Sequence, residues 1–267
     1  MVLCRTGRTF MDALIRSLSS YDEYKACERL QADVFGYDDI EILPYQILQS
    51  FAYAGGIVLG AFYADELIGA VMGYTGLTED GKTYHRSQRL AVLPRYAGRG
   101  VGESLKRAQG RLALQYGLHL MCWTYDPLRA VNAHLNIHKL GAVSRQYFER
   151  IYTTSSNPRD AGLPVDRLWV EWNLDAPAAV RPQEGRTAEV VLSAKHDKPA
   201  QADLTSTAAS VIIQIPSSID AVREQGMDNL LAWRNATREA FTHYFAQGYV
   251  VCDFVRDTGY VLAQVDL

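Results

Sequence analysis

The feature that most constrains this sequence is the segment from Leu90 to Gly102, which reads LAVLPRYAGRGVG. An apolar run ends at Pro94, three glycines follow at alternate positions, and an apolar stripe of helical period then begins. The pattern predicts a strand, a tight turn and a helix in direct succession, because proline ends strand pairing and glycine permits positive φ. The first N–H groups of such a helix have no partner within the helix, so the turn favours a phosphate.

Basic side chains surround this turn. The range 86–111 contains seven basic residues and one acidic residue. Arg95 and Arg99 flank the turn and are expected to form charge-assisted hydrogen bonds with a pyrophosphate. Lys106 and Arg107 follow on the predicted helix and are expected to raise the local positive potential further.

Two other phosphate motifs are excluded. The dinucleotide fingerprint GxGxxG needs a glycine where Glu103 stands, and the nucleoside-triphosphate loop needs GK[ST], which does not follow. The turn therefore predicts a different phosphate ligand.

The stretch resembles motif A, [QR]xxGxG/A, of the GNAT superfamily of acyl-CoA N-acyltransferases. The match consists of Arg95, Gly98 and Gly100. Its context is also similar, because a strand reading Leu-Ala-Val-Leu-Pro precedes it and an amphipathic helix follows. Further on, Asn132 precedes a helix that ends in Lys-Leu-Gly-Ala at 139–142.

The resemblance covers about residues 12–174. It implies an α/β fold with a GNAT-like mixed, partly antiparallel central sheet flanked by helices, and acetyl-CoA or another acyl-CoA as co-substrate without a metal. The coenzyme would lie where two parallel strands ending near Leu93 and Thr124 splay apart. Strand backbone groups would bind the pantetheine and the thioester. Amides of the glycine turn would bind the pyrophosphate, and the asparagine would bind the pantetheine arm. The cofactor-binding residues implied are Leu90, Val92, Arg95, Gly98, Arg99, Gly100, Val101, Gly102 and Asn132.

The implied reaction is attack of an amine on the thioester carbonyl, which needs a proton for the leaving thiolate. The sequence departs from the family at the usual acid, because Ile137 stands where a tyrosine is expected. Tyr125, Asp126 and His134 are the candidates to replace it, and spacing does not choose among them. We expect an N-acetyltransferase acting on a small-molecule or peptide amine. The alternative is a catalytically silent CoA-binding module that regulates or scaffolds a partner.

Two further patterns bear on ligands. His134 and His138 have a spacing that suits a shared metal, but no glutamate lies between them, so we expect ordinary histidines and no metal. The acidic run at 38–41 lies where family members often shape the acceptor site. It favours a cationic amine, with a solvated loop as the alternative.

Periodicity and breaker residues predict the secondary structure. Helices are expected over 22–35, 44–54, 100–116 and 127–140, and strands over 56–63, 67–74, 85–93, 118–124, 143–152 and 167–174. These elements make up a GNAT-like acyl-CoA-binding domain over 1–174.

Beyond residue 174 the composition shifts toward Ala, Pro, Gln, Ser and Thr. We expect a linker or excursion over 175–209, with one strand near 187–192, and a small α+β appendage over 210–267. The appendage is predicted to contain a strand at 211–215, a helix from Ser218, a long helix at 228–247 and a hairpin at 249–265. Arg234 and Arg238 are assigned to the polar, solvated face of the long helix. The appendage is expected to pack on the first domain or on a second subunit, as in a homodimer.

Net charge and cysteine content indicate which partners and which cellular location to expect. The formal net charge of -3 gives no field toward nucleic acid or an anionic membrane, and no basic stripe with interleaved aromatics is present. The four cysteines, at positions 4, 27, 122 and 252, form no CxxC and suit reduced thiols. No apolar run reaches the length of a membrane span. We therefore expect a soluble, cytoplasmic protein with no nucleic-acid or membrane partner.

Overall fold

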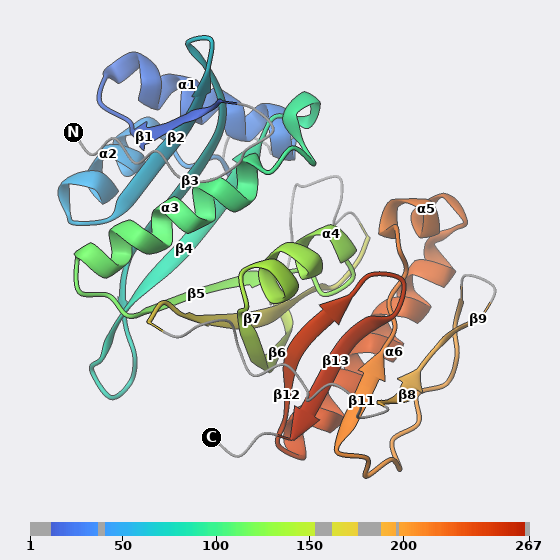
Figure 1. Cartoon of the computed structure of the whole chain (residues 1–267). Coiled ribbons are helices and arrows are strands. Elements are labelled where there is room, and N and C mark those ends of the chain that lie inside the picture. The colour runs from blue at the N-terminus through green and yellow to red at the C-terminus, as the bar shows by residue number, and fades with distance from the viewer. Residues whose placement is uncertain (1–11, 37–40, 153–161, 176–187, 196–197, 265–267) are drawn as a thin grey trace. The chain divides into compact units, whose positions relative to one another are not determined.

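The computed structural model describes residues 12–36, 41–152, 162–175, 188–195 and 198–264 (Figure 1). The chain packs as two compact units. The first comprises Met1–Trp123, Ser156–Pro158 and Asn173–Asp175, and the second comprises Thr124–Ser155, Arg159–Trp172 and Ala176–Leu267. The predicted domains at 1–174, 175–209 and 210–267 stay a prediction.

The sheet of the first unit has the strand order β1-β2-β3-β4-β5. Its strands are β1 (Leu14–Ser17), β2 (Ile57–Tyr63), β3 (Glu66–Leu77), β4 (Thr83–Val92) and β5 (Leu120–Tyr125), which begins in this unit. Neighbours from β1 to β4 are antiparallel, whereas β4 and β5 are parallel. The strands predicted over 56–63 and 67–74 are confirmed and form a hairpin, with φ of 46° at Ala64 and 64° at Asp65. The edge strand β1 was not predicted.

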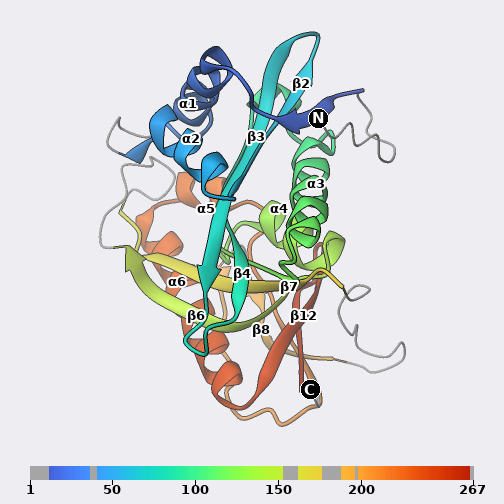
Figure 2. The same ribbon diagram turned by 90° about the vertical axis from the view of Figure 1, so that its left-hand side faces the viewer.

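Helices cover both faces of this sheet. α1 (Tyr21–Phe35) begins at Ser20, whose hydroxyl accepts the Glu23 N–H at 3.2 Å, and ends at Gly36 with φ of 64°. α1 and α2 (Tyr45–Tyr53) share one apolar cluster with the sheet, and α3 (Val101–Gln115) shares another. Figure 2 shows α1 and α2 on one side of β2 and β3 and α3 on the other. The three helices lie close to their predicted ranges.

The second unit joins the last strands of the family-like segment to the C-terminal residues. Its sheet has the order β7-β6-β12-β13-β11-β8. The strands are β6 (Val143–Tyr152), β7 (Val165–Asn173), β8 (Glu189–Leu192), β11 (Ser210–Ile213), β12 (Tyr249–Val255) and β13 (Gly259–Gln264). A separate pair is formed by β9 (Ala194–Lys195) and β10 (Lys198–Pro199). The strand predicted near 187–192 and the C-terminal hairpin are confirmed.

Three helical segments pack in this unit. α5 (Ile219–Glu224) begins at Ser218, and α6 (Met227–Ala246) is the long predicted helix. α4 (Ala130–Ala133) continues as a π-helical segment, η3 (His134–Lys139). The predicted start of this helix at Pro127 is wrong by three residues, because a turn at Asp126 comes first. The Asp126 carboxylate accepts the Leu128 N–H, and its carbonyl accepts the N–H of Arg129.

No helix in the described ranges is both long and apolar enough to cross a membrane. Cys27, Cys122 and Cys252 are buried free thiols, and Cys4 lies outside the described residues.

Candidate active site

The glycine turn has the geometry that the sequence predicts. After β4, a single 3₁₀ turn, η2 (Pro94–Tyr96), leads to Gly98 with φ of 74° and Gly100 with φ of 81°. A Cβ at either glycine would meet no atom within 4 Å. Positive φ, rather than crowding, therefore calls for glycine at both positions.

α3 begins with an open N-terminus. Gly100 is its N-cap and offers no side chain to the first-turn amides, and the first helical hydrogen bond runs from the Ser104 N–H to the Gly100 carbonyl at 3.0 Å. The amides of Val101, Gly102 and Glu103 precede that bond. They form the kind of donor set, at the positive end of a helix dipole, that binds phosphate.

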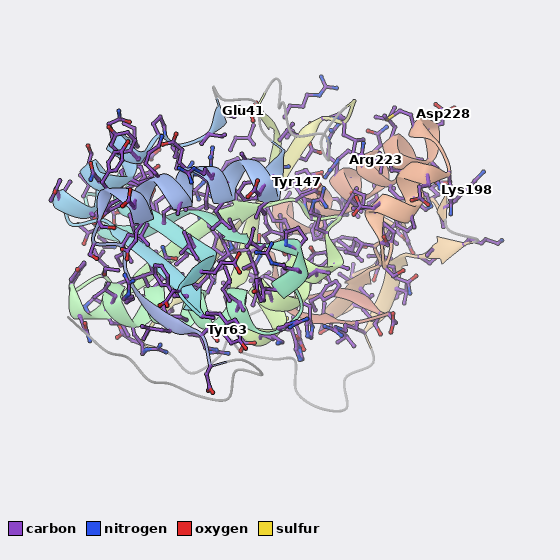
Figure 3. All side chains as sticks on the ribbon, turned by 90° about the horizontal axis from the view of Figure 1, so that it is seen from above. Glu41, Tyr63, Tyr147, Lys198, Arg223 and Asp228 are labelled. Atoms are coloured by element: carbon purple, nitrogen blue, oxygen red, sulfur yellow. The ribbon has the colours of Figure 1, made fainter. Side chains whose placement is uncertain are left out.

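Two arginines stand at this turn around one tyrosine. The Cζ atoms of Arg95 and Arg99 lie 5.2 and 5.9 Å from the ring centroid of Tyr96. Arg95 forms an ion pair with Glu66, and the Tyr96 hydroxyl donates to the same carboxylate at 3.0 Å. Tyr63, at the end of β2 and labelled in Figure 3, meets the Tyr96 ring edge-on at a centroid distance of 6.3 Å. Two cations are thus held beside the amide cluster.

β4 and β5 pair over only a short length. The parallel register consists of His85 with Met121 and Arg86 with Cys122, although β4 continues to Val92. The last six residues of β4 therefore extend beyond its paired part with β5. This is the splayed arrangement that the family resemblance implies.

The backbone of Leu90 and Val92 points toward that edge. The N–H of Leu93 donates to the Ile68 carbonyl of β3 at 3.0 Å. Because hydrogen-bonding direction alternates along a strand, Leu93 and Ala91 face β3, whereas Leu90 and Val92 face away from it.

A β-bulge in β4 was not predicted. Met72 pairs with Arg89 and Gly73 with Ser87, so Gln88 is an extra residue in the strand. The sequence of β4 contains no glycine, and its mixture of apolar and polar residues gives no signal for such an insertion.

Arg89, the residue after the bulge, holds the loop before α2 by hydrogen bonds. The Arg89 guanidinium donates to the Gln31 side chain at 2.6 Å and to the carbonyl of Glu41, labelled in Figure 3. Gln31 in turn exchanges two hydrogen bonds of 3.1 Å with the backbone of Leu43. Of the predicted acidic run, Glu41 is described, whereas Asp38 and Asp39 lie outside the described residues.

Lys106 does not add to the positive potential, so this prediction is wrong. Its side chain is 3% exposed, and its ammonium nitrogen donates to the Ser87 hydroxyl at 2.9 Å. Burial, helped by the nearby charge of Arg86, lowers its pKa well below the ordinary value. Arg107 pairs instead with Glu103 at 3.0 Å along the helix surface.

Two catalytic candidates lie at the end of β5, in the second unit. The Tyr125 hydroxyl donates to Tyr260 at 3.1 Å, and burial raises the pKa of Tyr125. Asp126 accepts two hydrogen bonds from Arg234, at 2.8 and 2.9 Å. Burial alone would raise the pKa of Asp126, but the Arg234 guanidinium outweighs it and lowers the pKa. Asp126 is therefore an ionised partner of Arg234.

The third candidate lies on η3. The His134 ring stacks on His138 at a centroid distance of 4.8 Å, and burial, then the charge of Arg256, lowers the pKa of His134. His138 contacts Asp253 of β12 at 2.9 Å. His134 is thus a neutral imidazole at pH 7, able to accept a proton.

The family positions around His134 differ in burial. Ile137, in the place of the usual tyrosine, is 1% exposed, whereas Asn132 is half-buried on α4. Among the described residues, no three or more His, Cys, Asp or Glu side chains gather into a group that would hold a metal.

A second carboxylate in this unit binds α6. Arg238 donates to Asp166 at 2.9 and 3.1 Å, and the hydroxyl of Tyr147, labelled in Figure 3, donates to Asp166 at 2.8 Å. The prediction that Arg234 and Arg238 occupy a solvated face is wrong for Arg234, which is 1% exposed. Helical period separates polar from apolar positions, but it does not reveal a buried carboxylate far away in the sequence.

The α/β fold is similar to that of solved GNAT-family acetyltransferases. Residues 21–138 match the model of the Acetyltransferase (GNAT) family. A GNAT-family acetyltransferase from Streptococcus pneumoniae superimposes with a TM-score of 0.50 at 18% identity, covering 61% of this chain and 99% of that one. The protein yncA from Salmonella typhimurium, solved with its cofactor acetyl-CoA, gives a TM-score of 0.50 at 17% identity, covering 62% and 96%. No curated protein sequence matches the chain.

Proposed function

We propose that the protein is an N-acetyltransferase that moves the acetyl group of acetyl-CoA to an amine. The observation that supports this best is the open N-terminus of α3, which follows two positive-φ glycines after the part of β4 that extends beyond its pairing with β5. The family match of residues 21–138 agrees with it.

In this proposal the amides from Gly98 to Gly102 bind the pyrophosphate, and the guanidinium groups of Arg95 and Arg99 neutralise its charge. Backbone groups of Leu90 and Val92 hold the pantetheine and thioester along β4. When bound, acetyl-CoA supplies an activated carbonyl carbon for attack by the amine. Asn132 is assigned to the pantetheine arm from the family's sequence pattern.

Proton transfer is assigned to His134. Tyr125 has a raised pKa and donates to Tyr260, and Asp126 is an ionised partner of Arg234. Neither is suited to exchanging a proton near neutral pH. The imidazole of His134, with its lowered pKa, is suited to accepting a proton from the amine as its nitrogen attacks the thioester carbon. When the C–S bond breaks, the protonated ring would return this proton to the CoA thiolate.

The acceptor is proposed to be a small-molecule or peptide amine. The loop before α2, which Arg89 and Gln31 fix to β4, is the element we assign to acceptor binding. Glu41 is its described acidic residue. We also propose a cytosolic location, which the three free thiols support.

Isothermal titration of acetyl-CoA into the purified chain tests cofactor binding. We expect a micromolar Kd that the Gly100→Glu variant abolishes. Gly117→Glu is the matched control, because Gly117 also has positive φ, of 75°, also faces open space and lies just beyond the other end of α3. Equal loss in both variants would show that backbone strain, rather than a blocked phosphate site, is responsible. Absence of heat with the unmodified chain would reject the proposal.

Turnover is tested by thiol release from acetyl-CoA with a panel of amines and N-terminal peptides. Release that depends on an amine supports transfer, and His134→Gln is expected to lower kcat and to remove the acidic limb of its pH profile. Binding without amine-dependent release from any member of the panel would favour the silent CoA-binding module.

A further inference from the structure

Lys106 lies where β4 and β5 separate. The paired part of the two strands ends at Arg86 and Cys122, so Ser87 and Trp123 are the first residues beyond it. From α3, the Lys106 nitrogen reaches both, donating to the Ser87 hydroxyl at 2.9 Å and lying 3.5 Å from the Trp123 ring centroid. All three residues belong to the first unit. We name them the apex plug.

The apex plug is closed to solvent. Ser87 and Trp123 are 4% and 5% exposed, close to the 3% of Lys106. The Ser87 hydroxyl also donates to Gln109 at 2.8 Å, and His85 is fully buried nearby. A lysine is rarely buried to this degree. Burial lowers its pKa, and its slender side chain lies between Ser87 of β4 and Trp123 of β5.

We propose that the apex plug is the floor of the acyl pocket and restricts the transferred group to acetyl or a group of similar size. The inference rests on the proposed function, in which the pyrophosphate lies at the glycine turn and the thioester at Leu90. A ligand bound in that direction runs along β4 toward Ser87. Leu90 follows Ser87 by three positions, roughly 10 Å of extended strand, and the bulge at Gln88 shortens this path.

Substitutions of Lys106 change the volume of the side chain that forms this floor. Lys106→Ala removes four side-chain atoms and leaves the Ser87–Gln109 hydrogen bond in place, so it opens an apolar space beside Trp123. Lys106→Met keeps a long unbranched side chain without the amine and keeps the floor closed. The two variants therefore separate volume from amine chemistry at one position.

The test measures Kd by isothermal titration of CoA, acetyl-CoA, butanoyl-CoA and hexanoyl-CoA into the full chain. Unmodified protein is expected to bind acetyl-CoA better than the longer thioesters. In Lys106→Ala the ratio of hexanoyl-CoA to acetyl-CoA affinity is expected to rise about tenfold or more, as for pockets that gain or lose methylene-sized space. Lys106→Met is expected to keep the original ratio.

Trp123→Leu opens the other side of the apex plug and serves where Lys106→Ala does not fold. Leu48→Ala, in the apolar cluster under α2, is the control for a buried truncation elsewhere in the unit. A chain that binds neither CoA nor acetyl-CoA would reject the proposed function. A chain that binds both, but whose chain-length ratio is the same in both opened variants, would overturn this inference alone.

Discussion

The guanidinium of Arg234 and the carboxylate of Asp126 form a two-bond ion pair in which the side chains are 1% and 3% exposed. The pair joins α6 to the turn that begins α4, because Asp126 also accepts the Leu128 N–H at 2.9 Å. A residue near the C-terminus thereby fixes the segment that leads to Asn132 and His134.

Breaking the Arg234–Asp126 ion pair is expected to destabilise the fold. Arg234→Met leaves Asp126 buried without its cation, so the free energy of unfolding should fall by about 3–5 kcal/mol. Urea denaturation measures the loss. The double variant Arg234→Met with Asp126→Asn is expected to recover much of it, because no unpaired charge remains. A single variant as stable as the unmodified chain would contradict this view of the pair.

The pH dependence of stability should carry a contribution from His85. Burial, with the charge of Lys106 second, lowers its pKa to about 4. Below the unfolded value of about 6.5 the unfolded chain takes up a proton that the folded chain does not, so stability falls from about pH 6.5 to pH 4 by about 3 kcal/mol. His85→Leu should not show this loss. Denaturation curves that stay parallel for both proteins across this range would refute the assignment.

Lys106→Met is expected to stabilise the fold. The buried amine has a lowered pKa, so between that pKa and about pH 10.4 the unfolded chain binds more protons than the folded chain. The stability of the unmodified chain should therefore fall as pH falls below that value, whereas the variant does not lose this contribution. Denaturation at pH 9.5 and 7.5 measures the difference in the free energy of unfolding between the variant and the unmodified chain. This difference should be larger at pH 7.5. A difference that stays constant or narrows would mean that the pKa of the amine is not lowered in the folded chain.

Glu66 is expected to compete with the ligand for Arg95. Its carboxylate pairs with the guanidinium beside the glycine turn, where both side chains are partly exposed. Glu66→Gln should release the arginine and tighten acetyl-CoA binding by about two- to fivefold, in line with the small value of exposed ion pairs. Titration at two salt concentrations measures this effect. Asp80→Gln, which breaks the exposed Asp80–Lys82 pair, is the control and should leave the Kd unchanged.

Local signals were sufficient for much of the fold. Ser20 and Gly36 delimit α1, and the proline and glycines from 94 to 102 specify the turn and the start of α3. Each is a short-range requirement of the backbone, so it is visible in a few adjacent residues. β1 escaped prediction because four residues at a sheet edge have too little alternation to stand out.

The features missed at the site are long-range. The bulge at Gln88 depends on the register with β3, and the ion pairs of Arg234 and Arg238 depend on carboxylates at positions 126 and 166. Lys106 was expected to raise the local positive potential because its sequence neighbours are basic. Its burial follows from the position of α3 over Ser87 and Trp123, which periodicity alone does not give.

The composition of the second unit has an evolutionary consequence. Residues 124–155 and 159–172 share a compact unit with the C-terminal residues, and α6 supplies the cations for Asp126 and Asp166. A lineage that lost the C-terminal segment in one genetic event would leave two carboxylates without their arginines. Such a loss is tolerable only together with neutral replacements at 126 and 166, so these four positions are expected to be inherited as a set.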